Sequence, residues 1–413
     1  MIHRYTLDNG LRVVVEPLEH LRSATMGIWV AAGSRCENKE NNGVSHFLEH
    51  MFFKGTARRS AADIAREMDR IGGQSNAFTA KECTCFHAKC LDEHLEEAFA
   101  ILADMYHNSL FRPQDIETER GVIREEINMY EDSPDDLCID LLHENMWRDS
   151  TLALPILGTA DSVAGMDREM LLQYRSAHYT PGNTVIAVAG KVEPEQFLHW
   201  AQREFGAFAN LTRRHAQTPP VYRPCVLRRE KEIEQNHLAI GLEGAPLGSD
   251  ELYPQSLVNN ILGGSMSSRL FQEIREKRGL AYSIYSFTTS FQDTGALTIY
   301  AGLNPSAQRE TLEIIRQEMQ EMAQNGVSEE EFRRGREQIK ANLIMGQEGT
   351  SSRMSALARG ELFHKRYVPL EEMISKLEAV TLEQVNEMAA RVLRPEQASY
   401  CVVGQTQDLL PGE

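Results

Sequence analysis

Two histidines and a glutamate stand close together in the first part of the chain, in the pattern His46-x-x-Glu49-His50. On a helix, residues four positions apart share a face, so both imidazoles could point at a single metal ion. H-x-x-E-H is the inverted zinc motif, in which the glutamate lies beside the metal as a base without being a ligand. A five-residue pattern also arises by chance, so a third ligand is needed from elsewhere in the chain.

A segment beginning at Pro113 offers two candidate carboxylates. Apolar and acidic residues recur there at intervals of three and four, which predicts the core-facing stripe of an amphipathic helix. The stripe consists of Ile116, Glu119, Ile123, Glu126 and Tyr130. Buried carboxylates must be paired or bind metal, so the alternative is a salt bridge, for example with Arg120 or Arg124. The histidine motif in the same half favours metal, although the stripe alone leaves open which glutamate is the ligand.

Both segments have the features of helices. Pro113 suits a first helical turn, because its missing N–H would have no partner there in any case. The neighbours of the two histidines are apolar and would pack on the other side of their helix; they are Phe47, Leu48, Met51 and Phe52. We therefore expect this helix to be buried around a polar stripe, and a buried polar stripe needs partners.

The composition of the 413 residues excludes several classes of protein. Hydrophobic residues make up 42% and charged residues 25%, which is typical of a globular chain of about two to four domains. No apolar run approaches the roughly 20 residues that span a bilayer, so we expect no membrane partner. With 43 basic and 60 acidic residues, the net charge of −17 disfavours nucleic acid. We see no signal-peptide pattern and expect a cytoplasmic protein.

The seven cysteines are an odd number spread along the chain, which favours reduced thiols over a disulfide framework. Three of them, Cys83, Cys85 and Cys90, raise the alternative of a second metal site. Their C-x-C-x4-C spacing fits no usual zinc pattern. The segment ECTCFHAKC is better interpreted as a strand.

A polar, proline-containing stretch between Asn210 and Pro224 is typical of a linker. It predicts a first half at residues 1–210, a linker at 211–224 and a second half at 225–413. The halves resemble each other in the order of their elements, which indicates a duplicated α+β unit of strands, helices and further strands. Chance similarity between amphipathic helices is the alternative.

The duplication provides an internal control for the candidate site. The segment from His46 aligns with that from Ser256, and the segment from Phe111 aligns with that from Val327. In this alignment His46, Glu49, His50, Glu119 and Glu126 correspond to Ser256, Asn259, Asn260, Gly335 and Asn342. The apolar pattern is kept while all five side chains are replaced. The fold therefore does not require them, and chemistry explains their presence in the first half.

The block HFLEHMFFKGT, followed by Glu126 at 76 positions after His50, resembles the pitrilysin/insulinase family of zinc metallopeptidases. The resemblance covers essentially the whole chain and is closest to the branch of the mitochondrial processing peptidase and its bacterial relatives. It implies that His46, His50 and Glu126 bind one Zn²⁺ per chain and that Glu49 is the general base. It also implies that Glu119 is the second carboxylate, which orients the site.

Two further segments match this family. In SSRLFQEIREKRGLAYSIYS, Arg275 and Tyr282 match a pair that contacts the substrate backbone and stabilises the tetrahedral intermediate. Both side chains can donate hydrogen bonds to a carbonyl oxygen as it gains charge. The strand on which the family lays its substrate is matched by Asn76, Ala77, Phe78 and Thr79. One departure, STLALPILGT in place of a His-Pro-containing stretch, puts only loop detail in question.

The resemblance implies an α+β fold of two related halves, each a mainly antiparallel sheet covered by helices, packed as a clam shell. It implies a zinc-dependent endopeptidase that cleaves extended, unfolded oligopeptides in an enclosed chamber. Because one chain holds both the zinc residues and the Arg/Tyr pair, we expect a homodimer to suffice. Basic peptides would be preferred if the acidity lines the chamber. The alternatives are a non-catalytic core or partner subunit of a complex and a zinc hydrolase of non-peptide substrates.

Overall fold

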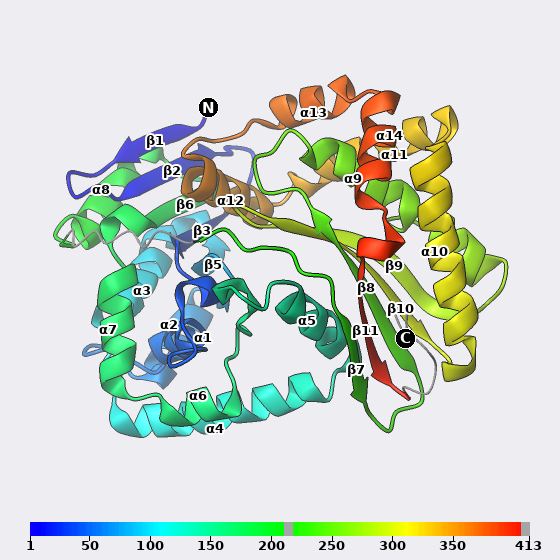
Figure 1. Cartoon of the computed structure of the whole chain (residues 1–413). Helices are drawn as coiled ribbons and strands as arrows, with labels where there is room; N and C mark the ends of the chain where they lie inside the picture. Colours follow the sequence, from blue (N-terminus) through cyan, green and yellow to red (C-terminus); the bar gives the residue numbers. More distant parts are fainter. Residues whose placement is uncertain (210–217, 406–413) are drawn as a thin grey trace. The chain divides into compact units, whose positions relative to one another are not determined.

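The computed structural model describes residues 1–209 and 218–405, which form two compact units (Figure 1). Among the described residues, the first unit contains 1–127, 154–209 and 346–368, and the second contains 128–153, 218–345 and 369–405. Each unit has one sheet with helices, so the predicted α+β class is confirmed. The predicted linker at 211–224 lies in part outside the described residues. No helix in the described ranges is long and apolar enough to cross a membrane.

The sheet of the first unit has six strands in the order β1-β2-β6-β3-β5-β4. The strands are β1 (His3–Thr6), β2 (Arg12–Pro17), β3 (Ser23–Val30), β4 (Gln74–Thr79), β5 (Thr84–Leu91) and β6 (Thr184–Gly190). All neighbours are antiparallel except β2 and β6, which are parallel. A turn that contains Gly10, at φ 89°, connects β1 to β2. Strand β4 is at one edge, and this edge adjoins the candidate site.

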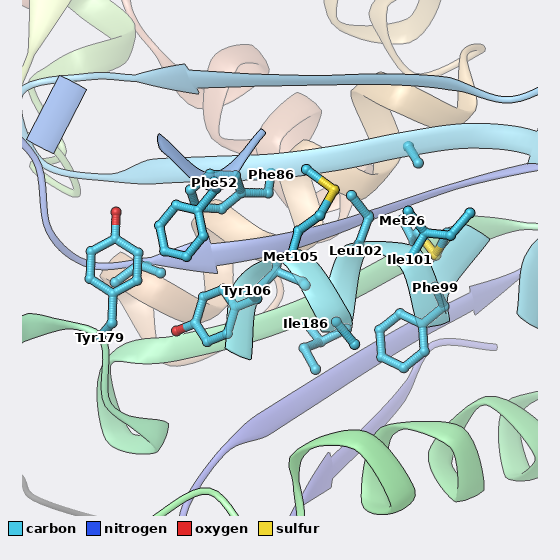
Figure 2. Close-up of a cluster of buried hydrophobic side chains, with 14 of the residues drawn as sticks. Met26, Phe52, Phe86, Phe99, Ile101, Leu102, Met105, Tyr106, Tyr179 and Ile186 are labelled. Carbon is cyan, nitrogen blue, oxygen red and sulfur yellow. The ribbon is translucent and has the colours of Figure 1, made fainter. Parts of the chain in front are cut away.

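The helices of the first unit surround this sheet. They are α1 (Val44–Phe52), α2 (Ala61–Arg70), α3 (Leu95–Asn108), most of α4 (Pro113–Glu131), α6 (Ala160–Gly165), α7 (Arg168–His178), α8 (Pro194–Phe205) and α12 (Thr350–Arg359). Figure 2 shows part of the core, where Phe52 of α1 meets Phe86 of β5 at 4.7 Å and Tyr106 of α3 at 6.0 Å between ring centres. Burying a side chain such as Phe52 stabilises the fold by about 1.5–3 kcal/mol. These contacts anchor α1 to the sheet.

The second unit repeats this plan with its own core. Its strands, in the order β7-β11-β8-β10-β9, are β7 (Val226–Glu230), β8 (Asn236–Gly244), β9 (Ala281–Ser290), β10 (Gly295–Leu303) and β11 (Ser399–Gly404). Its helices are α5 (Pro134–Met146), α9 (Leu252–Leu262), α10 (Gln308–Asn325), α11 (Glu329–Gly346), α13 (Leu370–Ala379) and α14 (Leu382–Val392). Only β7 and β11 are parallel. Apart from β1, both sheets therefore have the same order and directions, which supports the inferred duplication.

One helix from each half of the sequence belongs to the unit formed mainly by the other half. Helix α5 lies against β8 and β11 in the second unit, and α12 lies against β3 and β6 in the first unit (Figure 1). The indole N–H of Trp29 donates to Sδ of Met354 at 3.1 Å, and Thr25 and Thr350 are hydrogen-bonded at 2.8 Å. Every residue of β6 is buried. A sheet that is apolar on both faces must be covered on both, and α12 supplies part of that cover.

Candidate metal centre

Helix α1 places the two histidines of the H-x-x-E-H motif side by side. His46 and His50 lie one turn apart, with 4.6 Å between their ring centres. The predicted apolar face is fully buried in the core and consists of Phe47, Leu48, Met51 and Phe52. Since this face cannot turn away from the core, the polar stripe of α1 is held in one direction.

Glu126 of α4 meets the two histidines, although 76 residues separate it from His50 along the chain. One donor atom from each of the three residues lies within 4.8 Å of the others. Oε2 of Glu126 is 3.6 Å from Nε2 of His46 and 3.6 Å from Nε2 of His50. Within residues 1–209 and 218–405, no other group of three His, Cys, Asp or Glu side chains converges in this way.

Glu119 lies on α4, as Glu126 does, but it contacts the other ring nitrogen of His50, Nδ1. Its Oε2 is 2.9 Å from Nδ1 of His50, and its other oxygen forms an ion pair with Lys54. The carboxylate is 2% exposed. By bonding Nδ1, Glu119 leaves Nε2 of His50 directed at Glu126, as outer carboxylates do at zinc-bound histidines. The salt bridge considered for Glu119 therefore exists with Lys54, whereas Arg120 bonds Glu117 and the carbonyl of Met166.

Only the first three of the five predicted stripe residues of α4 are buried. Ile116, Glu119 and Ile123 are buried, but the side chain of Glu126 is 35% exposed and Tyr130 is 43% exposed. The prediction that Tyr130 faces the core is wrong. Helix α4 passes out of the first unit after Ile127, so its last turn has no core of that unit to face.

The surroundings of the two histidines shift their pKa values in opposite directions. Burial, together with the nearby His50, lowers the pKa of His46 to about 3, which keeps its imidazole neutral as a metal ligand requires. For His50, burial acts to lower the pKa, but the hydrogen bond that its Nδ1 makes to the Glu119 carboxylate and the nearby negative charge of Glu126 outweigh burial and raise the pKa overall. The pKa of Glu119 is lowered: burial opposes the charge, but its bonds to His50 and Lys54 prevail.

Glu49 lies next to the three converging side chains but is not one of that group. Burial raises the pKa of its carboxyl, and the hydrogen bond from Thr79 partly offsets this. Oγ1 of Thr79 donates to Oε2 of Glu49 at 2.5 Å. A carboxylate with a raised pKa beside a metal site is suited to accept and return a proton. The bond also connects Glu49 to the edge strand β4.

The four residues predicted to hold substrate all lie on β4, and they are Asn76, Ala77, Phe78 and Thr79. The strand pairs with β5 on one side, and no described strand pairs with its other side. Phe78 is 38% exposed and its ring packs edge-on against Trp29 at 5.3 Å. An open strand edge of this kind offers backbone N–H and C=O groups to an added extended chain.

Arg275 and Tyr282 come together in the second unit, and so they form a group separate from that of α1 and α4. The guanidinium of Arg275 lies 4.7 Å from the ring centre of Tyr282 and 4.8 Å from that of Phe271. Arg275 is in a π-helix, Phe271–Glu276, and Tyr282 is 76% exposed near the start of β9. Sequence reasoning missed Phe271 and Lys54. Phe271 stands four residues before Arg275 in the same helical segment, and that spacing could have indicated their contact. Lys54 lies just beyond the end of α1, so helical spacing gives no signal for it.

The residues of the first group fit a catalytic zinc ion. Two imidazoles and one carboxylate are the ligand set of catalytic zinc sites that keep one position open. The alternative site at Cys83, Cys85 and Cys90 is not formed among the described residues, where these buried thiols lie on or next to β5 as the strand prediction required. All seven cysteines are free thiols.

Comparison with known proteins finds similar chains along nearly the whole length of the protein. A family model described as Insulinase (Peptidase family M16) matches residues 12–160, and one described as Peptidase M16 inactive domain matches residues 165–339. The uncharacterized zinc protease YmxG of Bacillus subtilis is 43% identical over 398 residues, which cover 96% of this chain and 97% of that protein.

Solved structures share the fold at lower identity. The peptidase M16 inactive domain from Pseudomonas fluorescens has a TM-score of 0.92 at 20% identity and covers 100% of both chains. A chain of complex III2 from Candida albicans has a TM-score of 0.87 at 20% identity, over 99% of this chain and 97% of that chain. Because two successive family models and a relative of nearly equal length match it, the protein belongs to the insulinase family of peptidases, peptidase family M16.

Proposed function

We propose that the protein is a zinc-dependent endopeptidase that hydrolyses peptide bonds in extended, unfolded oligopeptides. The observation that carries the proposal is the convergence of His46, His50 and Glu126, with Glu49 beside them. The zinc protease name of the Bacillus subtilis relative supports the choice of metal and reaction. The roles of the ligands and of the base rest on the geometry of the site and on membership of the family together.

In this proposal His46, His50 and Glu126 hold the zinc ion. When bound, zinc acts as a Lewis acid that acidifies water and polarises a peptide carbonyl. Glu49 takes the proton of the attacking water and returns it to the leaving amine. Glu119 keeps His50 oriented through its 2.9 Å contact with Nδ1.

Two further groups serve the substrate. The edge of β4 binds the peptide as an added strand, so main-chain hydrogen bonds supply affinity with little demand on sequence. Arg275 and Tyr282 donate hydrogen bonds to the carbonyl oxygen as it gains charge. Since a single chain carries both groups, we propose a homodimer that needs no second kind of subunit.

A non-catalytic role in a larger assembly is the second candidate. The likeness to a chain of complex III2 and the match to a family model named for an inactive domain favour it. Against it, Glu49 and the three converging ligands are all present in this chain. A chain that had lost its chemistry would have no need to keep a buried, charged site.

The deciding experiment measures hydrolysis of a quenched fluorescent peptide of about 15–20 residues by the purified full chain. We expect cleavage that a zinc chelator abolishes and that added Zn²⁺ restores. A chelator-treated sample that still cleaves at the original rate would contradict the zinc mechanism. A zinc-loaded chain that cleaves none of a library of unfolded peptides would favour the non-catalytic role.

A further inference from the structure

A buried carboxylate outside the predicted site holds the N-terminus of α1. Glu37 is 3% exposed and lies seven residues before the helix begins. Its Oε2 accepts hydrogen bonds from the backbone N–H of Gly43 at 2.7 Å and from the side-chain amide of Asn42 at 2.9 Å. Its Oε1 accepts from the backbone N–H of Ser45 at 2.8 Å. Both oxygens are therefore used at one helix end.

The helix cannot supply this cap from its own capping position. Gly43 is the N-cap residue, with φ 92° and no side chain to accept a hydrogen bond. A Cβ atom added there would lie 2.7 Å from the carbonyl oxygen of Leu157 and 2.9 Å from Cα of Gly158, so only glycine fits. The usual Ser, Thr, Asp or Asn cap is excluded, and Glu37 satisfies the free N–H groups from a distance.

The position of His46 depends on this first turn. Nδ1 of His46 is buried and has no hydrogen-bond partner among the described residues, whereas Nδ1 of His50 is bonded to Glu119. A metal-binding histidine is ordinarily oriented by a bond at its second nitrogen. His46 lacks that support, and it stands in the first turn of a helix of only nine residues. Helix ends fray first, so a loose N-terminus would move His46 before any other ligand.

The second unit again provides a comparison. Helix α9, which corresponds to α1, has Ser256 at the position of His46 and no metal ligands. Its capping residue Glu251 makes no side-chain hydrogen bond to the helix. Among the described residues, a carboxylate therefore caps α1, which carries the proposed metal ligands. No side chain of the capping residue does so at α9, which carries none.

We propose that Glu37 is a positioning residue of the metal centre, which locks the first turn of α1 and thereby holds His46 in place for the metal. The inference rests on the proposed function in one respect, since it takes zinc as the ion that His46 binds. It goes beyond that function in assigning a role to a residue that does not touch the metal.

The test is the zinc affinity of Glu37→Gln in the full chain, measured by competition with a chromophoric chelator. The amide keeps the size of the side chain but turns an N–H₂ group toward the N–H donors of Gly43 or Ser45. We expect the affinity for Zn²⁺ to fall by about tenfold, in the range found for residues that support metal ligands. This readout does not depend on peptide hydrolysis.

Glu331→Gln is the matched control. Glu331 is also a carboxylate at a helix N-terminus, where its Oε2 accepts from the backbone N–H of Ser328 at 2.8 Å, but its helix α11 carries no proposed ligand. We expect this variant to unfold at a lower temperature while its zinc affinity stays that of the wild type. Equal losses of zinc affinity in both variants would overturn the inference.

Glu37→Asp covers the case in which Glu37→Gln fails to fold. The shorter carboxylate keeps its charge but cannot reach both Gly43 and Ser45, so we expect a smaller loss of zinc affinity in a chain with native circular dichroism. A folded Glu37→Gln or Glu37→Asp chain with wild-type zinc affinity would overturn the role of Glu37 and leave the proposed function intact. A wild-type chain that binds no zinc would overturn both.

Discussion

Helices α1 and α9 occupy equivalent places in two sheets of the same strand order, yet only α1 carries groups that can bind a metal. The correspondence holds in space as well as in sequence. In the first unit, His50 contacts Glu119. In the second unit, Asn260 faces Gly335: a Cβ atom at Gly335 would lie 3.2 Å from Oδ1 of Asn260.

This difference shows which side chains the fold itself needs. The second unit keeps its apolar core with Asn260 hydrogen-bonded to Gln338 at 3.2 Å in place of a His–Glu pair. A neutral amide pair satisfies the same buried position at a lower cost than a charged network. The charged network of the first unit is therefore best explained by function, and substitutions at paired positions should separate function from fold.

The largest expected effect comes from Glu49→Gln. Loss of the proposed base should reduce kcat by about 10²–10⁴-fold while zinc content stays at one ion per chain, because the amide cannot accept the proton. Its counterpart Asn259→Asp should leave kcat unchanged, since no ligands surround that position. Peptide hydrolysis and metal analysis on the same samples test both. Cleavage by Glu49→Gln at the wild-type rate would remove Glu49 from the mechanism.

Glu126→Ala should weaken zinc binding by more than the roughly 10–100-fold typical of residues that only support a ligand. The reason is that one of three converging donors is lost. Asn342→Ala, at the equivalent position of the second unit, should bind zinc as the wild type does. Equilibrium dialysis with metal analysis provides the measurement. Unchanged stoichiometry and affinity in Glu126→Ala would make Glu119 the next candidate for the third ligand.

Tyr282→Phe tests the group that the second unit contributes. Removing one donor to a developing oxyanion typically costs about 10²-fold in kcat, and we expect a loss of that order with little change in KM. Tyr285→Phe is the control, because Tyr285 lies on the same strand and is 40% exposed. If both variants lost activity equally, the hydroxyl of Tyr282 would have no special role.

The smallest effect concerns the net charge of −17. If acidic side chains surround the bound peptide, KM for a basic peptide should rise by about two- to fivefold between 0.05 and 0.5 M salt, since screening weakens the attraction. A neutral peptide of the same length should show no such change. If KM depended on salt in the same way for the two peptides, the acidic residues would have no role in substrate binding, and solubility would explain the net charge.

Local spacing made much of the site predictable. The interval of four residues placed His46 and His50 on one helical face, and the apolar residues between them identified the buried side of α1. The same spacing rule wrongly predicted that Tyr130 is buried, because periodicity along a helix does not show where the helix extends beyond the core. It also missed Glu37, whose bonds to Gly43 and Ser45 join a loop to a helix and leave no periodic trace.

The sequence by itself determined the α+β class, the duplicated order of elements and the residues with metal-binding chemistry, since these depend on side-chain type and short-range spacing. The periodic stripe alone left open which glutamate meets the histidines, and the family resemblance implied Glu126. The tertiary structure brings Glu126 to the histidines and Glu119 to Nδ1 of His50. It alone also decided that α5 and α12 are exchanged between the two units. Contacts between residues far apart in the chain depend on how whole elements pack, and no local pattern records that.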